Sequence, residues 1–119
     1  MANKDFLLKV IIPTEDGLTV SAAFDKAPFY LCFNLSELSY QLAEKLREHE
    51  WNQINMDELH LDAAIKVASN TALKAEQLLC IEVDSEIPIE EALHRVIDNM
   101  QTVAYFQKQQ PTGVIELEK

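Results

Sequence analysis

The stretch from Val10 to Leu35, VIIPTEDGLTVSAAFDKAPFYLCFNL, constrains the fold of this chain most. It joins the end of an apolar run, a turn at Asp16-Gly17, a short β-rich segment and the most aromatic segment of the sequence. The apolar run itself is Phe6–Ile12, FLLKVII, and its apolar residues are continuous rather than alternating. This pattern predicts a strand that is buried on both faces, at the centre of a sheet.

Two further strands and a helix are predicted after this run. Residues 18–20 can return antiparallel as a short second strand, and the aromatic residues 29–35 form a third. Ser36 suits the N-cap of a helix over residues 37–50. Leucines recur there at helical spacing: Leu35, Leu38, Leu42 and Leu46. Apolar residues also occur at every second position at 38, 40 and 42, so a strand of a hairpin is the alternative to this helix.

The second half of the sequence alternates between strand and helix patterns. Residues 51–61 form either a helical turn that begins near Asn55 or a long connection. Buried strands are predicted at 63–68 and 79–83, with a short helix at 72–78 between them. The clearest helix follows, with Pro88 in its first turn, where a missing N–H costs nothing.

This order of elements predicts a single α/β domain over residues 1–100. It gives a mixed sheet of five strands with helices on its faces, and the later crossovers are right-handed. Residues 101–119 are predicted to be a tail. Within it, Val114–Leu117 either adds an edge strand or stays mobile.

The formal charge of −10 is concentrated in two blocks of the 119-residue chain. Residues 36–62 carry seven acids against two bases, and residues 82–98 carry six acids against one. An acidic surface repels phosphate backbones and anionic membranes, so nucleic acid and membrane are excluded as expected partners. The blocks are interpreted as solvated helix faces, with a docking surface for a basic partner as the alternative.

We expect a cytoplasmic protein without a catalytic site. The N-terminus has charges inside its apolar stretch and does not resemble a signal peptide. Cys32 and Cys80 each lie in an apolar run and are expected to be buried, unless the fold makes them neighbours that share a metal. His49, His60 and His94 are expected on the surface, so no metal ligand is predicted. The sequence also lacks a P-loop, a nucleophile elbow and the HExxH and GxGxxG motifs.

The segment Val20–Tyr30, VSAAFDKAPFY, resembles the signature V-x-x-H-F-G-R-A-x-x-F of the dinitrogenase iron–molybdenum cofactor biosynthesis family. Residues 63–83 resemble that family's strand–loop–helix–strand, and IPIEEALHRVI resembles its closing helix. The resemblance covers roughly residues 7–100. It implies a ribonuclease H-like fold, a mixed five-stranded sheet whose second strand is antiparallel.

By this resemblance, the protein is a non-catalytic carrier that binds or chaperones an iron–sulfur or iron–molybdenum cluster or its precursor. A cluster donor or acceptor protein is then the implied partner. The ligand-binding residues that we predict lie in two loops: Phe24, Asp25, Lys26, Ser69, Asn70 and Thr71. Lys26 would contact an anionic ligand, and residues 69–71 would meet it at a helix N-terminus.

The chain departs from the family at the signature itself. Ala23 stands where the family has His, Asp25 replaces Gly, and Lys26 replaces Arg. Residues 69–71 also lack the glycines of the family's loop. The alternative hypothesis is therefore an acidic protein-interaction module that has lost the cluster site. A metal-dependent hydrolase on the same fold is a third, weaker alternative.

Overall fold

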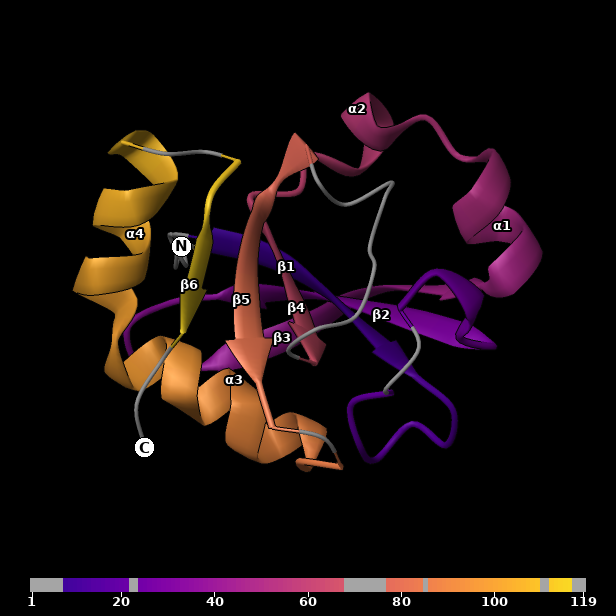
Figure 1. Cartoon of the computed structure of the whole chain (residues 1–119), viewed down its shortest axis with the longest axis horizontal. Coiled ribbons are helices and arrows are strands. Elements are labelled where there is room, and N and C mark those ends of the chain that lie inside the picture. The colour runs from indigo at the N-terminus through magenta and orange to yellow at the C-terminus, as the bar shows by residue number, and fades with distance from the viewer. Residues whose placement is uncertain (1–7, 22–23, 68–76, 85, 110–111, 117–119) are drawn as a thin grey trace, which may run out of the picture.

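A computed structural model of the chain describes residues 8–21, 24–67, 77–84, 86–109 and 112–116 (Figure 1). Its centre is a six-stranded sheet in the order β3-β2-β1-β4-β5-β6. The strands are β1 (Leu8–Thr14), β2 (Phe29–Leu35), β3 (Tyr40–Arg47), β4 (Ala63–Val67), β5 (Leu79–Val83) and β6 (Val114–Glu116). The predicted mixed α/β sheet is confirmed, with six strands instead of the expected five.

The direction of the strands divides the sheet into two parts. β2 is antiparallel to both of its neighbours, β1 and β3. β1, β4, β5 and β6 are parallel, each to the next. The strand that runs against the others is therefore Phe29–Leu35, the segment predicted as the third strand.

The predicted second strand, residues 18–20, is wrong. Thr19 makes only an isolated bridge with Pro88. The Val20 N–H donates to the carbonyl of Ile87 at 2.9 Å, and the Ile89 N–H donates to the carbonyl of Leu18 at 2.8 Å. The segment therefore pairs with the residues that lead into a helix, and not with β1.

The helices cover both faces of the sheet (Figure 1). They are a 3₁₀ turn η1 (Phe24–Lys26), α1 (Glu48–Gln53), α2 (Met56–Leu59), α3 (Ile89–Asp98) and α4 (Met100–Gln109). On one face, α3 and α4 pack over a core cluster that contains Val10, Ile65 and Ile81. On the other face, α1, α2 and η1 enclose Ile11 and Trp51 in a second cluster. None of the helices in the described ranges is both long and apolar enough to cross a membrane.

β1 has the central position that its composition predicted. It lies between β2 and β4, and its side chains alternate between the two clusters. Val10, Ile11 and Ile12 are all fully buried. A continuous apolar run is required here because both faces of the strand are covered.

The predicted helix over residues 37–50 is wrong, and the hairpin alternative is correct from Tyr40 onward. The Ser36 hydroxyl accepts hydrogen bonds from the N–H groups of Leu38 and Ser39, at 3.3 and 3.0 Å, so it closes a turn between strands. A β-bulge opposite Cys32 then shifts the register of β3. Helical geometry begins only at α1, where the Glu50 side chain accepts from the Arg47 N–H at 2.9 Å.

The bulge also explains why the leucine spacing was misleading. Leu42 pairs with Phe33, whereas Leu46 pairs with Tyr30. Without a bulge, residues four apart in a strand share a face of the sheet. Here Leu46 is buried with Tyr30 in the cluster under α1, and Leu42 is half exposed on the side of Phe33.

The remaining predictions fit the structure more closely. The strand predicted at 79–83 is confirmed as β5, and the one at 63–68 is confirmed as β4 over Ala63–Val67, with residue 68 outside the described residues. The turn near Asn55 is confirmed as α2, with the Asn55 side chain accepting from the Asp57 N–H at 2.9 Å. Pro88 is the N-cap of α3. The predicted helix 72–78 lies mostly outside the described residues. At the C-terminus, α4 crosses the predicted boundary at residue 100, and β6 supplies the edge strand.

Trp51 tests the second core cluster. We expect Trp51→Ala to lower the free energy of unfolding by about 3–5 kcal/mol, because it removes a fully buried ring. Tyr105→Ala is the matched control, since that ring is 60% exposed, and it should change stability by less than about 0.5 kcal/mol. Urea unfolding followed by circular dichroism measures both, and equal losses would contradict this packing.

Candidate functional site

The sheet reverses its direction of winding between β1 and β4. From β1 the chain continues to β2 on one side, and from β4 it continues to β5 on the other. β1 and β4 are parallel, so their carboxyl ends, Thr14 and Val67, lie at the same edge of the sheet. Open α/β sheets bind ligands outside the carboxyl ends of their strands at such a switch point. The loops at this edge of the sheet therefore form the candidate site.

The loop that follows β1 is closed by its own side chains. The Thr14 hydroxyl is buried; it donates to the carbonyl of Thr19 at 2.7 Å and accepts from the Gly17 N–H at 2.9 Å. Asp16 Oδ1 accepts from the N–H groups of Leu18 and Thr19, at 2.8 and 2.9 Å. Gly17 has a φ of 80°, in the left-handed region that favours glycine. These bonds fix the shape of the loop before any ligand is present.

The backbone N–H groups of Leu18 and Thr19 also set the charge of this loop. By donating hydrogen bonds to Asp16, they hold the pKa of its carboxyl below 3.8. Asp16 is therefore a carboxylate at neutral pH, and both N–H groups are already occupied by it.

η1 is held at the same edge by Tyr30. The Tyr30 hydroxyl donates to the carbonyl of Phe24 at 2.5 Å and accepts from the Ala27 N–H at 3.2 Å. The Phe24 ring packs against Tyr30 and Trp51, with centroids 5.8 and 5.9 Å apart. Within the signature-like segment, Phe24 is therefore held by the aromatic rings of Tyr30 and Trp51. Lys26, the last residue of η1, is exposed.

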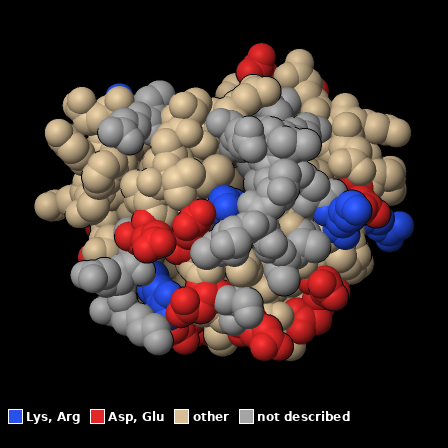
Figure 2. Space-filling model, viewed as in Figure 1, with Lys and Arg blue, Asp and Glu red and all other residues tan. Residues whose placement is uncertain are grey.

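Three exposed cations flank the start of β2 in the sequence or in the sheet register. Lys45 Nζ lies 5.1 Å from the ring centroid of Phe29, and Arg47 pairs with Phe29 in the sheet register. Lys26 lies three residues before Phe29 in the chain. We call Lys26, Lys45 and Arg47 the cationic corner. Figure 2 shows Lys and Arg side chains gathered on this side of a surface that is otherwise rich in acids.

The structure places the predicted ligand-binding residues unequally. Phe24 is 1% exposed, so its side chain serves the core instead of facing a ligand. The backbone of Asp25 lies within η1, and Lys26 is exposed. Ser69, Asn70 and Thr71 lie outside the described residues.

Cys32 and Cys80 are both buried and are not neighbours. β1 and β4 separate them, with Ile11 and Ala64 in the intervening register positions. Three strand spacings correspond to about 14 Å, too far for a shared metal ion. In the part of the chain that the structure describes, no group of three or more His, Cys, Asp or Glu side chains can hold a metal ion. The three histidines are exposed, as expected.

Burial and a neighbouring carboxylate keep Cys32 protonated. Desolvation raises the pKa of the Cys32 thiol to about 12, with a further contribution from Glu44, which Lys9 partly offsets. Glu44 reaches across β2 to Lys9, and Glu44 Oε1 lies 2.5 Å from Lys9 Nζ. A protonated, buried thiol is a poor nucleophile at physiological pH.

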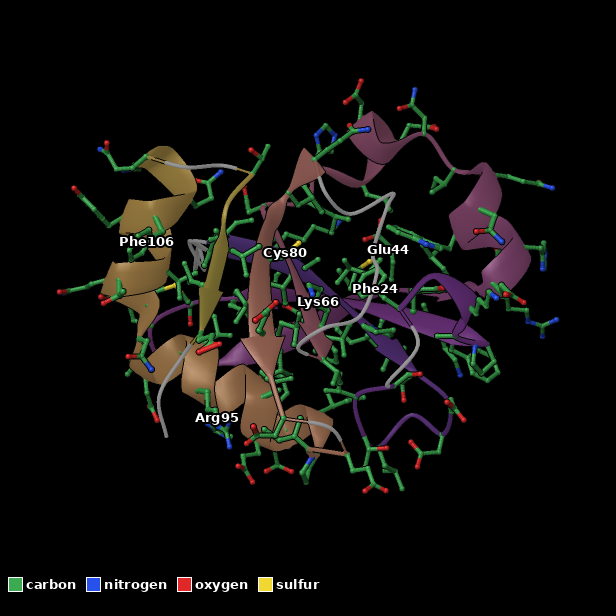
Figure 3. All side chains as sticks on the ribbon, viewed as in Figure 1. Phe24, Glu44, Lys66, Cys80, Arg95 and Phe106 are labelled. Carbon is green, nitrogen blue, oxygen red and sulfur yellow. The ribbon has the colours of Figure 1, made fainter. Side chains whose placement is uncertain are left out.

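Sequence reasoning missed the charged pairs on this face of the sheet. Besides Lys9–Glu44, Lys66 Nζ lies 3.1 Å from Glu82 Oε2, across the register between β4 and β5. Figure 3 shows Lys66, Cys80, Glu44 and Phe24 in the central part of the molecule, and Arg95 and Phe106 on α3 and α4. In the sequence, the Lys66–Glu82 pair is indicated only by one Lys within the apolar strand β4 and one Glu within the apolar strand β5.

No family model and no curated protein matches this chain.

The Asp16 loop yields a pH prediction. The pKa of folded Asp16 is below 3.8, so its stabilising effect is complete above that pH and is lost as pH falls through the lower folded pKa. We expect the amide chemical shifts of Leu18 and Thr19 to change together at acidic pH, as followed by NMR. Asp16→Asn retains an acceptor oxygen and should abolish this transition, whereas Asp16→Ala should shift both amides at every pH. An acidic transition in Asp16→Asn would contradict the assignment.

Cys32 is predicted to be inert until the protein unfolds. In a Cys80→Ala variant, where Cys32 is the remaining thiol, a disulfide reagent at about pH 8 should react only after denaturant is added, because the thiol is buried and neutral. Since the unfolded thiol ionises near 9.0 and the folded one near 12, the Cys32 contribution to stability should fall as pH rises between these values. Rapid reaction of the native variant would contradict the burial.

Proposed function

We propose that the protein is a non-catalytic carrier with a ribonuclease H-like fold that binds an anionic metal cluster or its precursor. Three features support the fold. The five strands β3-β2-β1-β4-β5 are adjacent in that order, β2 runs against its neighbours, and the signature-like segment joins β1 to β2. The sixth strand, β6, is an addition at the edge.

One observation carries the ligand proposal. In a chain with a net charge of −10, the exposed cations of Lys26, Lys45 and Arg47 flank the start of β2, at the edge of the sheet where β1 ends. A cationic corner on an acidic protein attracts anions locally while the rest of the surface repels them. Lys26 belongs to the signature-like segment and is the last residue of η1.

The cargo would be held by charge and hydrogen bonds. Cys32 is buried, and among the described residues no group of three or more His, Cys, Asp or Glu side chains is placed to hold a metal ion. The Arg-to-Lys change in the signature retains the charge but not the bidentate geometry. The protein therefore suits transient carriage of a cluster that arrives with its own ligands, more than permanent ligation by side chains.

The proposal is tested by anaerobic titration with isolated iron–molybdenum cofactor, followed by gel filtration and measurement of co-eluting iron. We expect iron to elute with the wild-type protein. Lys26→Ala should weaken binding about fivefold, as the loss of about 1 kcal/mol from one exposed ion pair predicts.

Lys108→Ala is the matched control, because that lysine is exposed in the last turn of α4, away from the corner. It should bind as wild type does. Absence of iron in the wild-type fraction would refute carriage of this cofactor, and equal binding by Lys26→Ala and the control would exclude the corner.

The interaction module is a second candidate. It is favoured by Ala23 at the position of the family's histidine, and by the patches of Asp and Glu on the described surface (Figure 2). On this hypothesis the titration fails, and the function resides in a protein-binding surface.

A further inference from the structure

An apolar groove lies on the face of the sheet that carries α3, and its far end reaches Lys45 of the cationic corner. It is bounded by the start of α3, the loop after β1 and the strands β2 and β3, and its cavity has a volume of about 420 Å³. Its lining residues are mainly apolar: Leu18, Phe33, Tyr40, Pro88, Ile89 and Leu93.

The floor of this groove is built of packed aromatic and apolar side chains. The Tyr40 ring packs edge-on between Phe33 and His94, with centroid distances of 5.8 Å to each. Phe33 and Leu93 belong to the buried core cluster. By contrast, Leu18 on the groove wall is 71% exposed. A fixed aromatic floor beside an exposed leucine is typical of a preformed binding surface.

A second cavity, of about 260 Å³, extends the apolar surface along β2 and β3. Phe29, Leu31 and Leu42 line it, and Leu42 is 51% exposed. Gly17 lines both cavities, so they meet at the loop after β1. Lys45 lies at the far end, over the Phe29 ring.

The rim of the groove is acidic. Glu90 lines the first cavity, and Glu15 and Asp16 line the second. Glu86 and Glu91 are exposed beside the start of α3. Figure 2 shows Asp and Glu side chains gathered along the lower edge of the view, over α3 and the loop after β1.

We propose that this groove docks a partner segment with bulky apolar side chains flanked by Lys or Arg. The apolar floor accepts the bulky side chains, and the rim acids attract the flanking cations. Glu90 and Glu15 contribute most, because Glu91 is paired with Arg95 at 2.8 Å and Asp16 already accepts from the N–H groups of its own loop. A second copy of this chain is disfavoured as the occupant, because it would bring its own charge of −10 toward the same acids. This inference is independent of the carrier function proposed above.

The test uses a fluorescein-labelled peptide of Leu and Lys, about 14 residues long, which forms an amphipathic basic helix. Fluorescence anisotropy should show binding that weakens with salt. A peptide of the same pattern with Glu in place of Lys should not bind. Equal binding of both peptides would overturn the proposed charge preference.

Variants locate the site. Leu18→Ser with Leu42→Ser removes two exposed leucines and should weaken binding at least about tenfold, without unfolding the protein. Val114→Ser is the matched control, since Val114 is 56% exposed on the opposite edge strand. It should leave binding unchanged. Equal affinity of the double variant and the control would refute the groove as the site.

A second pair of variants tests the rim. Glu90→Gln should weaken peptide binding, whereas Glu58→Gln, an exposed acid on α2, should not. Sedimentation of the wild-type protein without peptide tests the other occupant. A concentration-dependent dimer that the Leu18→Ser, Leu42→Ser variant abolishes would show that a second copy fills the groove, and would overturn the proposal.

Discussion

The structure depends on the burial of β1 on both of its faces. Val10 and Ile12 enter the cluster under α3 and α4, and Ile11 enters the cluster under α1 and α2. Because side chains in a strand alternate between faces, a slip of one residue would exchange these two sets and move Lys9 into the first cluster. The register of β1 is therefore strongly specified. It fixes β2 and β4 on either side, and with them the point where the winding of the sheet reverses.

The sequence predicted those elements whose signal is local. β2, β4 and β5 each have a short β-rich apolar run, and α3 has a single apolar stripe with acids in its first turn. The errors have non-local causes. Residues 18–20 pair with the backbone before α3, which is distant in the chain. β3 resembled a helix because its bulge, which only strand pairing reveals, moves Leu42 and Leu46 to different faces.

The candidate site was predictable only in outline. Lys26 was predicted as a ligand contact because of its position in the signature-like segment. In the structure it is exposed, in the η1 turn of the predicted loop. Its partners in the cationic corner come from the end of β3, which was predicted to be a helix. Lys9–Glu44 and Lys66–Glu82 depend on strand order and register, and so does the separation of Cys32 from Cys80. Residue spacing within one strand carries none of this information.

The loop after β1 connects the two surfaces that we propose for binding. Its start, Thr14, marks the sheet edge at which the cationic corner lies, and Gly17 and Leu18 form the wall of the apolar groove. The internal hydrogen bonds of Thr14 and Asp16 make this short segment stiff. The electrostatic character of the two surfaces is opposite, because cations gather at the end of β3 and acids at the start of α3. Opposite charge at the two surfaces would draw an anionic ligand to one and a basic partner to the other, and Lys45 lies where the two surfaces meet. Taken together, the two proposals describe a carrier that is loaded at one surface and recognised at another.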